Sequence, residues 1–165
     1  ASWISLRTTS LPRKTLLLNA VYSIVLGGVT VLLLMTQGVL SLNPWYSPSY
    51  MIPLGGMIFA NCMNSISLSA ERLESELKQG QSYEKAKVIA LRTSLIPITN
   101  MLLAVGLVSL PGMMTGQILS GVSPLIAVRY QIMVMCMIFG SSGISAAVFL
   151  HSAKDSFTEA KNRFE

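Results

Sequence analysis

The chain has 165 residues, of which 52% are hydrophobic and only 12% are charged, and its formal net charge is +5. Ordinary soluble domains carry a charged fraction of about 25%. A soluble helical protein of this length also could not bury four apolar runs of roughly 20 residues on all sides at once. The composition therefore argues against a soluble domain and favours an integral membrane protein.

Four apolar runs are each long enough to cross a bilayer. A helix rises about 1.5 Å per residue, so roughly 20 apolar residues cross a hydrocarbon core about 30 Å thick. The first three runs contain no charged residue, and the fourth contains only Arg129. Because every backbone amide in a bilayer must be satisfied within its own segment, these runs are helices. We expect an all-α, polytopic helical bundle that forms a single domain, with spans at residues 16–40, 49–70, 95–119 and 124–150.

The basic residues indicate how these spans are oriented. Eleven of the twelve Lys and Arg residues precede the first span, lie between the second and third, or follow the fourth. Since cytoplasmic loops retain Lys and Arg, we expect both ends of the chain and the central loop to be cytoplasmic, in a cell-membrane protein. The opposite connection, 41–48, carries Trp45 and Tyr46, which suit an interfacial aromatic belt. The positive charge thus indicates topology, and we expect no nucleic-acid partner.

The central loop, residues 71–94, begins with a polar helical pattern. Leu73 and Leu77 share a helix face at a spacing of four residues, and Glu74 and Lys78 can form an ion pair at the same spacing. We therefore expect residues 71–78 to form a short polar helix.

A turn and a second helix follow. Gly80 can adopt the left-handed conformation that ends a helix, and Ser82 can cap a helix from Tyr83 to Arg92. Most charged loops are solvated connectors, and that interpretation stays open. The functional alternative is a docking element that offers Leu77 and Tyr83 to a partner protein around the turn.

The third span contains a helix breaker. Pro111 cannot donate an amide hydrogen bond, and with Gly112 beside it the helix should kink or break there. Such a break is tolerated in a membrane only against protein or a water-filled cavity. Gly112 and Gly116 also form a GxxxG pattern that permits close helix packing. A transport pathway or hinge and a plain packing device are both compatible with these residues.

The spans also contain sulfur ligands. Thioether and thiolate groups can bind a soft transported metal, although Met more often fills irregular apolar gaps. The candidates are Met57, Cys62, Met63, Met113, Met114, Met133, Cys136 and Met137. Arg129, the charge inside the fourth span, either reaches the outer interface or pairs with Asn61 or Asn100.

The sequence contains no G-x-x-x-x-G-K-[ST] phosphate loop and no arrangement of a nucleophile with a His or carboxylate base. We therefore expect no enzyme activity and no cofactor on this chain. Any ATP must be hydrolysed by a separate subunit.

The central loop resembles a known docking loop. Residues 74–80, ESELKQG, followed by a helix that runs into 95–97, LIP, resemble the Glu-Ala-Ala, Gly, Leu-Pro loop of ABC permeases. In that family the loop docks on a cytoplasmic ATPase subunit. The resemblance implies that four residues couple this chain to such an ATPase, namely Glu74, Leu77, Gly80 and Tyr83.

Three further blocks resemble one branch of these permeases. They are residues 51–63, MIPLGGMIFANCM, residues 105–116, VGLVSLPGMMTG, and residues 121–132, GVSPLIAVRYQI. These blocks resemble the FetB/YbbM family of iron-export permeases and its plant aluminium-tolerance relatives. The family has further hydrophobic segments before the point that corresponds to Ala1, so we expect this chain to match the C-terminal two-thirds of a member. Where the family has an Asp and a Lys in the third span, this chain has Asn100 and Leu103.

This resemblance implies a permease subunit that works as a homodimer and exports an iron-like metal ion or another small solute. We expect the substrate pathway to follow the third span and its neighbours. The residues expected to line it are Asn61, Asn100, Ser109, Pro111, Gly112, Met113, Met114 and Gln131. Two other classes stay open at this point. An ATP-independent secondary carrier or channel is compatible with the broken span, and a structural membrane anchor would not need the break.

Overall fold

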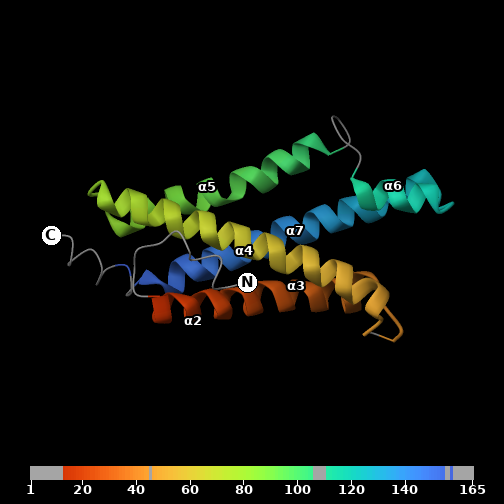
Figure 1. The fold of residues 1–165 in the computed structure, drawn as a ribbon, viewed down its shortest axis with the longest axis horizontal. Coiled ribbons are helices and arrows are strands. Elements are labelled where there is room, and N and C mark those ends of the chain that lie inside the picture. The colour runs from red at the N-terminus through yellow and green to blue at the C-terminus, as the bar shows by residue number, and fades with distance from the viewer. Residues whose placement is uncertain (1–12, 45, 106–110, 155–156, 158–165) are drawn as a thin grey trace.

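The structure, a computed structural model, describes residues 13–44, 46–105, 111–154 and 157. Four of its helices are long and apolar enough to cross a membrane: Leu16–Val39, Pro48–Lys78, Tyr83–Ala104 and Pro124–Ser152. They lie lengthwise beside one another, as Figure 1 shows. The expected all-α membrane bundle is thereby confirmed.

The first span is one continuous rod with two π-helical segments. It consists of α2 (Arg13–Ile24), η1 (Val25–Val29), α3 (Thr30–Leu33) and η2 (Leu34–Val39). Gly27 in η1 packs directly against the fourth span, because a Cβ atom built on it would lie 2.3 Å from Ser145 Oγ and 2.9 Å from the Ser145 backbone nitrogen. The first span therefore contacts its neighbour backbone to backbone, as small residues permit in membranes.

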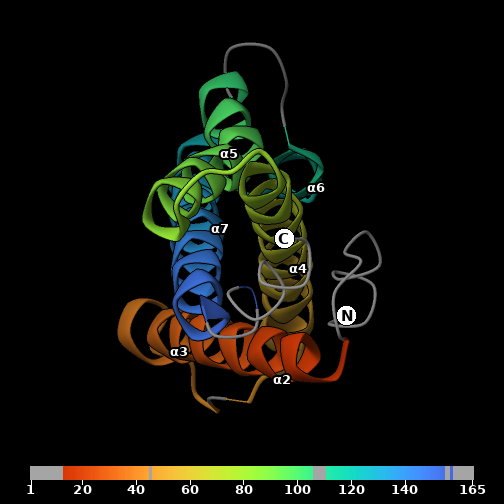
Figure 2. The same cartoon turned by 90° about the vertical axis from the view of Figure 1, so that its left-hand side faces the viewer.

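The helices α4 (Pro48–Lys78) and α7 (Pro124–Ser152) form the centre of the bundle. Figure 2 shows them side by side, with α2 and α3 on one side and α5 (Tyr83–Ala104) on the other. Their contact buries apolar side chains together with small polar ones, including Cys62, whose Sγ lies 3.5 Å from the Ser141 carbonyl oxygen. This apolar packing between the spans accounts for most of the described core, and the buried carboxylates Glu74 and Glu76 lie near the end of α4.

The expected boundaries differ from the observed helices at the central loop. Residues 71–78 do not form a separate helix, because α4 continues without interruption to Lys78. Likewise α5 begins at Tyr83 and runs through Arg92 into the apolar segment. Apolar side chains on these polar turns are buried against the bundle, so packing extends both helices beyond the lengths that hydropathy predicts.

The third expected span, 95–119, is not one helix. α5 ends at Ala104, where Val105 turns to an extended conformation with ψ 126°. A separate short helix, α6 (Gly112–Leu119), follows Pro111, whose own ψ is 140°. The predicted break at Pro111 and Gly112 is therefore observed, and the chain has already left the α5 helix by Val105.

Candidate functional site

A polar pocket lies between the middle parts of α4 and α5. Its volume is about 120 Å³, and the two helices contribute a mixture of polar and apolar walls. The polar lining is Asn61, Asn64, Ser65 and Ser94, and the apolar lining is Leu68, Pro97, Ile98 and Met101. Polar side chains at this depth of a membrane are costly and mark functional sites by default.

Two of the polar side chains in this pocket donate hydrogen bonds to carbonyls of their own helices. Asn61 Nδ2 donates to the Met57 carbonyl at 2.8 Å, and Ser94 Oγ donates to the Leu91 carbonyl at 2.8 Å. The amide oxygen of Asn61 and the lone pairs of Ser94 Oγ remain available as acceptors. Asn64 and Ser65 add an amide and a hydroxyl to the lining, so the pocket contains both donors and acceptors.

A second cavity of about 340 Å³ lies beside the break in the third span. Its walls come from the end of α5, from α6 and from α7. The lining is mostly apolar and consists of Leu102, Val105, Met114, Val128, Gln131, Ile132, Met135 and Cys136. Gln131 is buried and supplies the polar side chain of this wall.

The residues expected to line a pathway do not meet at one place. Asn61 lines the pocket between α4 and α5, whereas Met114 and Gln131 line the cavity beside α6. Asn100 is exposed on α5 and lines neither cavity. The neighbouring motif residues Pro111 and Met113 are half-buried, Gly112 is exposed, and Ser109 lies outside the described residues. A substrate pathway through these residues remains a prediction.

The sulfur-bearing residues are also dispersed. Cys62 and Met137 are buried in the core, Met57, Met63 and Met133 are half-buried, and Cys136 is exposed. Within the described part of the chain, no three His, Cys, Asp or Glu residues come together as a metal site. Met135 joins Met114 and Cys136 in the α6 cavity and was missed from the sequence. Its spacing to Val128 and Ile132 on one face of α7 was the signal that could have revealed it.

The turn between α4 and α5 has the geometry that the sequence predicts. Gly80 has a φ of +82°, in the left-handed region that favours glycine. Glu74 and Lys78 form the expected ion pair at 2.7 Å. Ser82 occupies the position before α5, but its side chain makes no capping hydrogen bond there.

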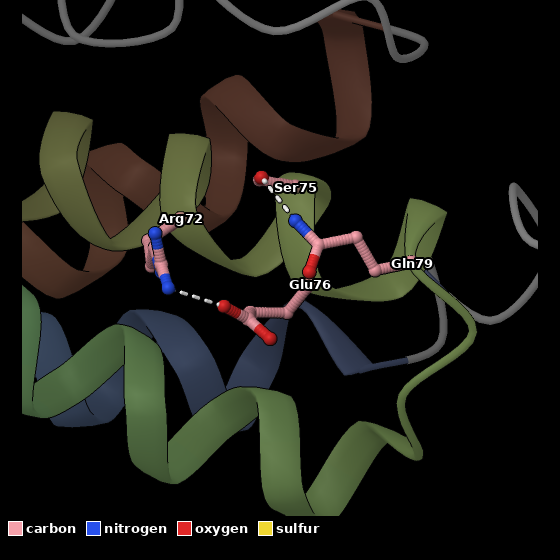
Figure 3. Close-up of polar contacts among 4 residues, drawn as sticks. All are labelled: Arg72, Ser75, Glu76 and Gln79. Carbon is pink, nitrogen blue, oxygen red and sulfur yellow. Dashed lines mark hydrogen bonds and ion pairs between the residues drawn. The ribbon is translucent and has the colours of Figure 1, made fainter.

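Further polar contacts stiffen the last turns of α4. Figure 3 shows the ion pair of Arg72 with Glu76 at 2.5 Å and the hydrogen bond from Gln79 to Ser75 at 3.5 Å. Both pairs are four residues apart, a spacing that stabilises a helix. The helix is therefore supported up to the turn itself.

Tyr83 is half-buried and lies beside the end of α7. Its hydroxyl donates a hydrogen bond of 2.5 Å to the Leu150 carbonyl of α7. Lys154 lies over the Tyr83 ring at 6.0 Å and approaches Glu84 at 3.6 Å. Leu77 also packs against the core, and both side chains are half-buried, so their role in coupling remains a prediction. Glu74 is buried, and the exposed part of the turn is Lys78, Gln79, Gly80, Ser82, Glu84 and Lys85.

The sequence of this chain matches the uncharacterised protein family UPF0014 over residues 1–157. The chain belongs to this family. The resemblance of its motifs to the FetB-type permeases is confirmed by the relatives within it.

Three relatives illustrate the UPF0014 match. The membrane protein slr1647 of Synechocystis is 46% identical over 61% of this chain and 45% of its own length. The probable iron export permease protein FetB of Escherichia coli is 28% identical over 99% of this chain and 67% of its own. The protein ALUMINUM SENSITIVE 3 of Arabidopsis thaliana is 35% identical over 68% of this chain and 46% of its own.

The chain thus spans between 45% and 67% of the length of these UPF0014 relatives. No solved structure matches it. Family membership and the four apolar helices together make it a multi-pass membrane protein.

Proposed function

We propose that this chain forms the membrane-spanning part of an ABC transporter permease that exports a metal ion or another small solute. ATP is hydrolysed on a separate cytoplasmic ATPase subunit, and two copies of the permease enclose the route. The Escherichia coli relative, named as a probable iron export permease, supports the transport class and an iron-like substrate.

The observation that carries the ATPase partnership is the construction of the turn at Gly80. A docking element must be exposed to its partner and rigidly joined to the spans that it moves. The turn meets the first requirement because Gln79 and Gly80 are exposed. It meets the second because α4 and α5 continue from it into the membrane and Tyr83 ties it to α7.

Substitution of Gly80 tests this proposal. Gly80→Val places a β-branched residue at a φ of +82°, where nothing lies within 4 Å of an added Cβ. The change therefore distorts the turn through backbone strain of about 1–3 kcal/mol, without a steric clash. We expect the complete subunit to insert normally but to lose the ATPase in co-purification.

Gly121→Val is the matched control. Gly121 has a φ of +89° in the turn between α6 and α7, and it also has open space around it. It carries the same strain at the opposite end of the bundle, so ATPase binding should persist. Equal ATPase binding by both variants would remove the docking role of the Gly80 turn. Transport that continues without any ATPase would favour a secondary carrier or channel instead.

A further inference from the structure

The cavity beside the break in the third span has the size of a site for a small molecule. Its volume is about 340 Å³, at the small end of the roughly 300–1,000 Å³ of pockets for drug-sized molecules. A water molecule takes about 30 Å³ of liquid, and on that scale the cavity has room for about ten non-hydrogen atoms. Its walls come from the end of α5, from α6 and from α7, so one occupant contacts all three helices.

One amide side chain dominates the polar part of the lining. Gln131 is only 4% exposed, and its amide makes no hydrogen bond to any residue that the structure describes. A buried amide without a partner costs free energy, and a ligand that supplies the partner removes that cost. The sulfur atoms of Met114, Met135 and Cys136 also line the cavity, but sulfur is a weak hydrogen-bonding partner.

The lining favours an uncharged ligand with one polar group. The remaining walls are aliphatic, and among the described residues no Lys, Arg, Asp or Glu lines the cavity. A charged ligand would lose its hydration here without gaining an opposite charge. The Gln131 amide both donates and accepts hydrogen bonds, so an amide or a hydroxyl group on the ligand can satisfy it.

We propose that this cavity binds a small, uncharged, mainly apolar molecule through one polar group that is hydrogen-bonded to Gln131. Three lining residues, Val128, Ile132 and Cys136, are exposed and follow one another at a spacing of four along α7, so they form the rim through which the ligand enters. The bound molecule bridges α5, α6 and α7 and therefore stabilises this arrangement of the break. Binding in the cavity does not depend on the proposed function.

Cys136 is a natural reporter for an occupant. It lines the cavity and is exposed, whereas Cys62 is buried in the core. The complete subunit in detergent is treated with N-ethylmaleimide, and the modification of Cys136 is followed by mass spectrometry. Octanamide, octanoate and decane serve as probes, because they are similar in size and carry an uncharged amide, a carboxylate and no polar group. We expect octanamide to slow the modification, and octanoate at neutral pH to have little effect.

Two glutamine substitutions form a matched pair in this assay. Gln131→Leu keeps the size of the wall but removes its hydrogen-bonding group, so the octanamide concentration for half-protection should rise about fivefold, as for the loss of one neutral hydrogen bond. Protection by decane should not weaken. Gln117→Leu removes another amide whose buried Oε1 lacks a partner, but Gln117 does not line the cavity, so octanamide protection should be unchanged. Each probe is compared with itself across variants, so its partitioning into detergent cancels.

A second reporter controls for effects of the probes on the detergent. Ile144 is exposed on α7 outside the cavity, so octanamide should not slow the modification of Ile144→Cys in a Cys136→Ser background. If Gln131→Leu does not fold, Gln131→Met makes the same comparison.

Four results would overturn the proposal. They are a Cys136 that does not react, which would show that another part of the complete subunit fills the cavity; octanamide protection that is absent or equal at both reporters; octanamide protection that the Gln131 substitution does not weaken; and octanoate protection as strong as that of octanamide. The labelling needs no ATPase, so Gly80→Val should leave it unchanged. Failure of ATPase docking and failure of ligand binding are therefore recognised separately.

Discussion

Gly27→Ala is expected to weaken the packing of the first span against α7 and so to lower the stability of the bundle. A Cβ at this position would lie 2.3 Å from Ser145 Oγ and 2.9 Å from the Ser145 backbone nitrogen. Atoms do not approach that closely, and the backbone nitrogen cannot turn away as a side chain can. Overpacking of this kind costs about 1–3 kcal/mol, while replacing a helical Gly by Ala recovers about 0.5–1 kcal/mol.

The two terms leave a net loss of up to about 2.5 kcal/mol in the free energy of unfolding, and relative to a glycine in open space the difference is the overpacking cost of about 1–3 kcal/mol. It is measured by thermal unfolding of the complete subunit in detergent. Gly38→Ala is the matched control, because Gly38 lies in the second π-helical segment of the same span and has nothing within 4 Å of an added Cβ. It should be neutral or slightly stabilising.

Gly28→Ala should unfold at a temperature between those of Gly27→Ala and Gly38→Ala. Its Cβ would lie 2.9 Å from the Phe59 ring, and that side chain can rotate away. Adding Ser145→Ala to Gly27→Ala should restore part of the stability, since the hydroxyl leaves and the backbone nitrogen remains. If Gly27→Ala unfolds at the same temperature as Gly38→Ala, the close contact between the first span and α7 is refuted.

Three further predictions concern coupling, the pathway and topology. Tyr83→Phe removes the hydrogen bond to Leu150 and should lower the free energy of unfolding, measured by thermal unfolding, by about 0.5–1.5 kcal/mol. It should also lower the stimulation of the ATPase. Unchanged stability and unchanged stimulation would show that this hydrogen bond does not connect the turn to α7. Pro111→Ala should leave an assembled complex that hydrolyses ATP but transports little in proteoliposomes, whereas wild-type transport would make the break a packing device. On intact cells an impermeant thiol reagent should label Ser47→Cys and spare Gln79→Cys, and the reverse pattern would contradict the orientation.

Several features of the fold could be predicted because they depend on short stretches of chain. The length of an apolar run and the need to satisfy its amides predict spanning helices wherever the run occurs. Pro111 breaks a helix through its missing donor, and Gly80 adopts its positive φ because it has no Cβ. The ion pair of Glu74 with Lys78 follows from helical spacing alone.

Other features depend on contacts between residues far apart in the chain. The sequence suggested that Tyr83 is offered to a partner, whereas packing turns its hydroxyl to the end of α7. Hydropathy placed the third span at 95–119, but the helix that packs along α4 is Tyr83–Ala104. Tertiary contacts stabilise a polar helical turn that hydropathy alone assigns to a loop.

The sequence by itself determined that this is a membrane bundle, which family its motifs resemble, and where its backbone must turn or break. These are consequences of the bilayer as a solvent and of the covalent properties of Gly and Pro. Only the tertiary structure decided that Asn61 and Ser94 face one pocket while Asn100 does not. The direction of a side chain depends on the rotation of its helix, and that rotation is set by contacts such as Gly27 with Ser145 on another span.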